Sequence, residues 1–107
     1  MIDFTELSEP DIIRLLGERF REYRLNLRLT QNELADKAGI SAKTISNFES
    51  GRLRNMSMRN FLTLMKVIGQ IGNIENLLPE LPESPYLLTR YAIKQNRVRH
   101  GKNSTER

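Results

Sequence analysis

Apolar residues recur at helical spacing in several segments of this chain, separated by polar or glycine-containing stretches. In the first segment, spacings of three and four predict a helix from Ser8 to about Leu27. Its predicted inward positions are Ile12, Ile13, Leu16, Phe20, Tyr23 and Leu27. A later helix, capped by Ser57 and stopped by Gly69, has a predicted buried stripe of Met58, Phe61, Leu62, Met65 and Ile68. A short last helix, capped by Asn73, would bring Ile74, Leu77 and Leu78 across the bundle.

Two shorter helices are predicted between these segments. Thr30 and Glu33 form a capping box, so a helix begins at Gln31 and ends at Ala38. Gly39 follows, where a left-handed backbone is wanted. Ser41 then caps a helix over residues 42–50, which Gly51 ends. Five short helices with little sign of strands predict an all-α fold: a compact five-helix domain over residues 1–78.

The helix over residues 42–50 has an unusual outer face. Only Ile45 and Phe48 are large and apolar, so these two must face the core. The outward residues are small, polar or basic and include no carboxylate: Ala42, Lys43, Thr44, Ser46 and Asn47. A duplex carries about one negative charge per 1.7 Å of axis, so a surface that enters its groove must avoid acids. Glu49 is expected to turn inward and meet an arginine. The pattern therefore indicates a helix that reads the DNA major groove.

The stretch from Leu29 to Gly51 resembles the helix-turn-helix of the lambda repressor/Cro-type regulators, the XRE family. The residues that carry the resemblance are Thr30-Gln31, Glu33-Leu34-Ala35, Ala38-Gly39-Ile40-Ser41, Thr44-Ile45-Ser46, Glu49 and Gly51. With the first and fourth helices included, the resemblance covers roughly residues 15–78, and it implies the lambda-repressor-like fold.

The resemblance also implies roles for single residues. Gln31 would touch a phosphate or a base, and Ser41 and Thr44 would touch the DNA backbone. Base edges would be read by Ala42, Lys43 and Asn47. Ala42 departs from the longer polar side chain of many relatives and offers only a methyl contact, for instance to thymine. Base reading is therefore expected to depend more on Lys43 and Asn47. A buried ion pair between Arg24 and Glu49 is implied as well.

Positive charge gathers around this motif. Residues 28–66 hold seven basic and three acidic residues, and residues 86–107 hold six basic and one acidic. Arg52, Arg54 and Asn55 follow the second short helix, where a docked motif would meet the phosphates that border the groove. The resemblance adds that they reach the minor groove, whose narrow stretches attract arginine. An ordinary solvated loop is the alternative for these three residues.

A homodimer is expected, because one motif covers few base pairs whereas two related by symmetry read a palindrome. Its predicted surface consists of apolar residues in excess of what the core needs: Ile71, Ile74, Leu77, Leu78 and Leu81.

Composition excludes several other functions. The 107 residues include no cysteine and one histidine, His100, which has no positioned partner. No catalytic residue, metal site or cofactor site is predicted, and an enzyme is not expected. The acidic start of the chain lacks the apolar run of a secretory signal, and no stretch is long enough to span a membrane. We expect a cytoplasmic, nucleoid-associated protein of bacterial type. A pure protein-interaction module is an alternative, but it leaves the acid-free helix face unexplained.

The end of the chain permits several interpretations. Pro79, Pro82 and Pro85 predict an extended connector over residues 79–85. Residues 86–98 fit a basic amphipathic helix, and the rest of the tail, 86–107, is expected to be disordered towards its end. The tail could bind a partner protein, act as a non-specific DNA arm, or remain free. Its composition also resembles antitoxins that bind a HipA-type kinase toxin, here through residues 79–99, and repress their own operon. A stand-alone regulator is the other possibility.

Overall fold

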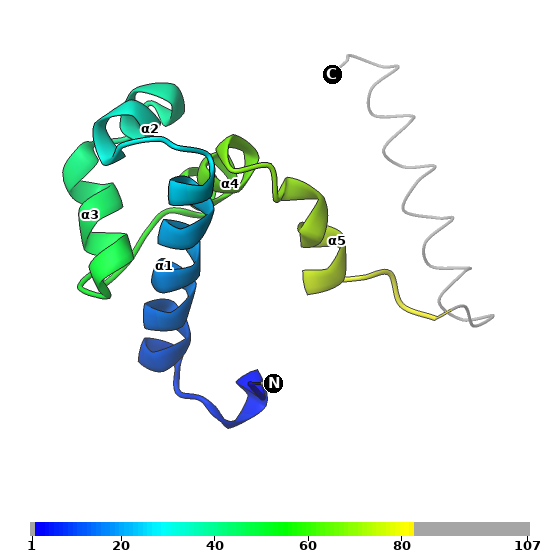
Figure 1. Cartoon of the computed structure of the whole chain (residues 1–107). Coiled ribbons are helices and arrows are strands. Elements are labelled where there is room, and N and C mark those ends of the chain that lie inside the picture. Colours follow the sequence, from blue (N-terminus) through cyan, green and yellow to red (C-terminus); the bar gives the residue numbers. More distant parts are fainter. Residues whose placement is uncertain (1, 83–107) are drawn as a thin grey trace, which may run out of the picture. The chain divides into compact units, whose positions relative to one another are not determined.

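The computed structural model describes residues 2–82, and the regular elements within them are all helices (Figure 1). Four helices of eight residues or more are α1 (Glu9–Asn26), α2 (Gln31–Ala38), α3 (Ala42–Ser50) and α4 (Met58–Val67). Shorter pieces are the 3-10 helices η1 (Phe4–Glu6) and η2 (Ile71–Asn73) and the single turn α5 (Ile74–Leu77). The chain divides into two compact units, residues 1–74 and 75–107, and α1 to α4 all lie in the first.

The long helices begin at the capping residues that the sequence predicts. The hydroxyls of Ser8, Ser41 and Ser57 accept a hydrogen bond from the backbone N–H three residues later, at 3.3, 3.1 and 3.0 Å. Thr30 forms the predicted capping box, in which Glu33 also accepts from the Thr30 backbone at 2.8 Å. Gly39 ends α2 in the left-handed conformation, at φ 69°. The predicted five-helix, all-α fold is therefore confirmed.

The core lies where α1, α2, α3 and α4 meet. α1 contacts α3, and α2 contacts both α3 and α4. Leu34, Ile45 and Leu64 from three different helices are fully buried, and the rings of Phe20 and Phe48 join α1 to α3 with centroids 5.3 Å apart. Full burial of a side chain of this size stabilises a fold by about 1.5–3 kcal/mol. These few residues therefore hold α3 against the rest of the unit.

The predicted inward face of α1 is partly wrong. Tyr23 and Leu27 are 42% and 46% exposed, so they do not belong to the core. Phe20 is buried as predicted, and the other buried residues of α1 are Gly17 and Arg24. A glycine and an arginine thus occupy two of the innermost positions, and neither counts as apolar in a hydrophobicity pattern. The apolar pattern consequently predicted burial for neighbouring residues of α1.

Two other predicted core assignments are also wrong. Met58 is 71% exposed, because the buried line of α4 passes through Leu64 and Ile68. At 100° per residue, Met58 lies about 120° around the helix from Leu64. Leu77 and Leu78, predicted to cross the bundle, are exposed as well. α5 is a single turn, too short to present a continuous apolar stripe.

Candidate DNA interface

Helix α3 has a buried side and a solvent side. Ile45 and Phe48 are buried in the core, and Glu49 is buried beside them at 6% exposure. Lys43 is exposed, and Ser46 and Asn47 are half-buried. Glu49 is the only acidic residue of this helix, so α3 presents no carboxylate to solvent. Its outer side therefore suits an approach to a polyanion.

The start of α3 is more involved in internal contacts than the sequence suggests. Ala42 is half-buried and packs against the core cluster, so only part of its methyl group is available to a ligand. The hydroxyls of Ser41 and Thr44 lie 2.8 Å apart and hydrogen-bond to each other at the exposed end of the helix. One of the two hydroxyls uses its single O–H in this bond, so only the other retains a proton to donate to a phosphate oxygen.

Arg24 and Glu49 form the ion pair that the resemblance implies. Nε of Arg24 donates to Oε2 of Glu49 at 2.7 Å, and Nη2 donates to Oε1 at 2.9 Å. Nη1 of Arg24 donates to the carbonyl of Leu29, also at 2.7 Å, so the arginine binds the α1–α2 turn as well. The hydrogen bonds that Arg24 donates to Glu49 raise the pKa of Arg24, against the opposing effect of burial. The two charges thus compensate each other inside the protein, and Glu49 presents no carboxylate to solvent.

Gln31 contacts the same ion pair, which sequence reasoning did not anticipate. It is the first residue of α2, and its Nε2 donates to Oε1 of Glu49 at 3.1 Å. The side chain is half-buried. The two residues are 18 positions apart in sequence, and no local pattern predicts that the start of α2 meets the end of α3.

Gly17 is a second residue that the sequence analysis missed. A Cβ atom at this position would lie 1.9 Å from the carbonyl oxygen of Phe48. α1 and α3 therefore touch backbone to backbone at Gly17, and only glycine permits that distance. The available signal was a glycine in the interior of a strongly periodic helix, where it usually has a packing reason.

The loop after α3 is fixed to the helix that precedes it. The carbonyl of Asn47 accepts hydrogen bonds from the backbone of Arg52 at 2.9 Å and of Leu53 at 3.1 Å. Gly51 adopts a left-handed conformation at φ 80°, and a Cβ there would meet the side chain of Arg14. The position of this loop consequently follows that of α3.

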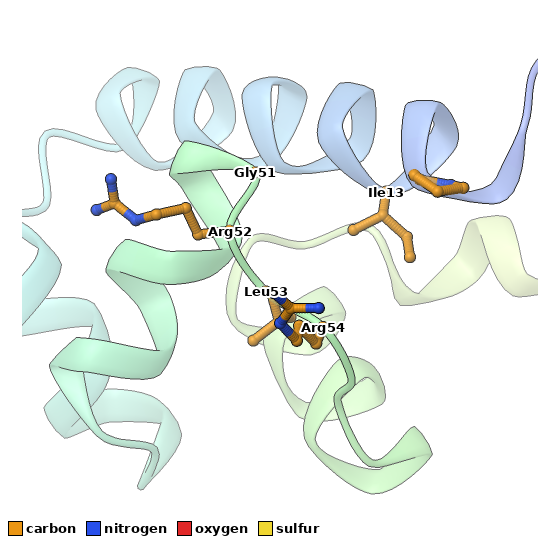
Figure 2. A pocket seen from close by; sticks show the side chains of 6 residues that line it. Ile13, Gly51, Arg52, Leu53 and Arg54 are labelled. Carbon is orange, nitrogen blue, oxygen red and sulfur yellow. The ribbon is translucent and has the colours of Figure 1, made fainter.

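A hollow of about 500 Å³ lies between this loop and the start of α1 (Figure 2). Its lining residues are Pro10, Ile13, Gly51, Arg52, Leu53 and Arg54. In Figure 2 the Arg52 side chain reaches away from Ile13 and Leu53. Arg52, Arg54 and Asn55 are exposed, and neither arginine takes part in an ion pair within the described residues. Their donors are therefore free to meet an anion.

The part of the chain that the structure describes offers little for other chemistry. Within residues 2–82, no cluster of three or more histidine, cysteine, aspartate or glutamate side chains is arranged to hold a metal ion. None of the helices in this range is long and apolar enough to cross a membrane. Partner binding was predicted for residues 79–99, of which 83–99 lie outside the described residues, as does His100.

Residues 20–76 match the model of a helix-turn-helix family, which is more than half of the chain. The chain belongs to this XRE-type helix-turn-helix family. The match begins in the middle of α1 and includes α2, α3 and α4 entire. The XRE-type protein is accordingly a DNA-binding transcription regulator. A comparison with curated proteins gave no significant match.

Proposed function

We propose that this regulator recognises a specific double-stranded DNA sequence by laying α3 in the major groove, and that it acts as a repressor. The observation that supports this most is the division of α3 into two sides. Ile45, Phe48 and Glu49 are buried, so α3 presents the exposed Lys43 and the half-buried Ser46 and Asn47 to solvent without a single carboxylate. A major groove is wide enough for one helix and distinguishes all four base pairs by their hydrogen-bonding groups.

Base reading falls to the polar residues on the outer side of α3, of which Lys43 is exposed and Ser46 and Asn47 are half-buried. Lys43 can donate to the O6 and N7 acceptors of guanine, and Asn47 can pair with the N6 and N7 groups of adenine. Ala42 offers part of a methyl group to thymine, and Ser46 adds a hydroxyl that suits several bases. These contacts would determine which sequence is bound.

Backbone contacts come from the flanks of α3. Gln31, Ser41 and Thr44 lie at the starts of α2 and α3, where helix dipoles favour phosphate. Arg52, Arg54 and Asn55 would meet the phosphates on the other border of the groove. Because the Asn47 carbonyl fixes this loop to α3, base reading and phosphate binding would occur in one register.

We further propose that the regulator binds as a homodimer. A nine-residue α3 spans only a few base pairs, and two copies one helical turn apart would read a palindrome. Leu77, Leu78 and Leu81 are 66%, 84% and 72% exposed, which makes them available for the predicted dimer surface. Sedimentation of the free chain and of its DNA complex tests the homodimer. A complex with a single copy of the chain per duplex would contradict it.

The central experiment is a selection of bound duplexes from a random or genomic library, followed by titration of the selected sequence. We expect Lys43→Ala and Asn47→Ala to weaken binding by about 1–3 kcal/mol and to relax preference at particular base pairs. Lys66→Ala removes the same charge from α4 and should leave sequence preference unchanged. Failure to enrich any sequence, or equal losses in all three variants, would overturn the proposal.

A second function is an antitoxin that binds a HipA-type kinase toxin through residues 79–99. It is favoured by three prolines followed by a basic tail. Co-expression with the neighbouring gene product distinguishes the two functions. A stable complex that dissociates on removal of residues 79–107 supports the antitoxin, and the absence of a complex supports a stand-alone regulator. In both cases the chain should lower the expression of a reporter gene that is controlled by the operator.

A further inference from the structure

The contact between Gln31 and Glu49 joins the buried ion pair to the edge of the proposed interface. Both oxygens of Glu49 already accept from Arg24, and Oε1 accepts a further hydrogen bond from Nε2 of Gln31. Three helices thus supply one member each: α1 the arginine, α2 the amide and α3 the carboxylate. The arginine and the glutamate are buried, whereas the glutamine is half-buried and reaches the surface.

The chemistry of Glu49 fixes how the Gln31 amide is turned. A carboxylate paired with arginine has no proton and can only accept hydrogen bonds. The amide nitrogen of Gln31 must therefore face Glu49, and its carbonyl oxygen must point away. One N–H of that nitrogen is used by Glu49, and the second N–H remains for another acceptor. Within the described residues the Gln31 side chain makes this one hydrogen bond.

Such an arrangement lowers the entropic cost of using Gln31 on DNA. A free glutamine side chain samples many rotamers, and fixing it on binding weakens affinity about 2- to 10-fold. Here the rotamer is already held by a hydrogen bond to a charged acceptor, which is stronger than one between neutral groups. The Gln31 side chain therefore loses its rotamer freedom when the protein folds and not when it binds DNA.

We propose that Glu49 is a positioning residue for DNA binding: it holds the Gln31 amide so that its free N–H meets a phosphate oxygen. Glu49 touches no DNA itself and acts through Gln31. The proposal rests on the proposed function, because it needs α3 in the major groove with the start of α2 beside the phosphates. It adds a second role to an ion pair that would otherwise serve only the fold.

The test removes the anchor while keeping the fold. Arg24 and Glu49 are both replaced by methionine, since a buried ion pair exchanged together for apolar residues often leaves stability unchanged. Gln31→Ala is then compared in this background and in the natural chain by titration of the selected duplex. We expect the loss of affinity in the natural chain to exceed that in the double variant by about 2- to 10-fold, which is the cost of fixing one free side chain. Gln70→Ala, a glutamine beyond α4, is the control and should bind normally.

A second variant keeps the experiment decisive if the double variant fails to fold. Gln31→Asn retains an amide but is one carbon shorter and cannot span the distance to Glu49. We expect it to lose as much affinity for the duplex as Gln31→Ala, measured at a temperature at which both variants are folded. Normal binding by Gln31→Asn, or equal losses from Gln31→Ala in both backgrounds, would overturn the positioning role alone. A natural chain that binds no duplex would overturn the proposed function with it.

NMR provides a readout that does not depend on DNA. The side-chain amide of Gln31 should be ordered in the free natural chain, and it should become mobile when Glu49 is replaced together with Arg24. This readout tests whether Glu49 orders the Gln31 amide, and the duplex titration tests what that order contributes to DNA binding. An amide that is already mobile in the natural chain would contradict the proposal directly.

Discussion

Replacing Gly17 by alanine should damage the fold more than any other single-methyl addition in α1. The added Cβ would lie 1.9 Å from the carbonyl oxygen of Phe48 and 2.9 Å from its carbonyl carbon. Both obstacles are backbone atoms of α3, so no side chain can rotate aside. Cβ atoms essentially never approach other atoms within 3.0 Å, so α1 and α3 would have to separate by more than 1 Å at this point.

The expected loss of stability follows from two opposing effects. Overpacking of a well-packed site typically costs about 1–3 kcal/mol, and an immovable backbone favours the upper end. Alanine in a helix interior recovers about 1 kcal/mol relative to glycine. A net loss of about 2 kcal/mol remains, which for a domain of this size lowers Tm by roughly 8–16 °C. DNA affinity should fall too, because α3 carries Lys43 and Asn47.

Thermal unfolding followed by circular dichroism measures the first effect, and duplex titration below Tm measures the second. Gly72→Ala is the matched control, because a Cβ at Gly72 would meet nothing within 4 Å. It should unfold near the natural Tm and bind normally. If Gly17→Ala proves as stable as the natural chain, the backbone contact between α1 and α3 is not as close as described, and the reasoning fails.

Three further predictions address the loop, a cap and the N-terminus. Arg52→Ala and Arg54→Ala should weaken binding to all duplexes alike, and each should reduce the slope of log K against log salt by about 1. A loss of affinity confined to one sequence would contradict this. Ser57→Ala removes the α4 cap and should cost about 1 kcal/mol in urea unfolding without changing DNA specificity. The pKa of Asp3 lies below its ordinary value of 3.8, first because the Thr5 hydroxyl donates to its carboxylate. This interaction slightly stabilises the folded state. The stabilisation is complete above pH 3.8 and is lost as the pH falls through the lower pKa of the folded state. An NMR titration should find this pKa closer to 3.8 in Thr5→Val, and an unchanged value would refute the assignment.

Local features of this fold were predictable because local chemistry determines them. Thr30, Ser41 and Ser57 cap helices through bonds to residues three positions away, so sequence spacing alone locates them. The left-handed Gly39 and Gly51 follow from the same logic. For α3, two apolar residues three apart were enough to predict which side is buried.

Features that depend on how closely helices approach were not predictable. Gly17 occupies an inner position of α1 because the backbone of α3 meets it there. The burial of Arg24 was implied by the family resemblance and not by the apolar pattern. Helical periodicity is read from apolar residues, so it predicted that Tyr23 is buried, whereas Tyr23 is exposed in the structure. The Gln31–Glu49 hydrogen bond likewise depends on the angle between α2 and α3. The burial of Ile45 and Phe48 was predicted from sequence, but the packing of Ala42 against the core and the contacts around Glu49 required coordinates.

The orientation of α3 links stability to DNA binding in a measurable way. Isolated helices shorter than about 12–15 residues are marginal in water, and α3 has nine residues. Its helical form and its position therefore depend on Ile45, Phe48 and Glu49, and an unfolded chain cannot present the recognition surface. A ligand that binds only the folded state stabilises it by about 2.7 kcal/mol at 100 times its Kd.

The selected duplex should consequently raise Tm in proportion to the logarithm of its concentration. The same concentration should raise the Tm of Lys43→Ala less, because Lys43 is exposed and its loss changes Kd without changing the fold. Two duplexes of equal length, one selected and one scrambled, separate sequence recognition from general attraction to phosphate. If both raise Tm equally at physiological salt, α3 contributes charge alone, and the assignment of base reading to this helix is refuted.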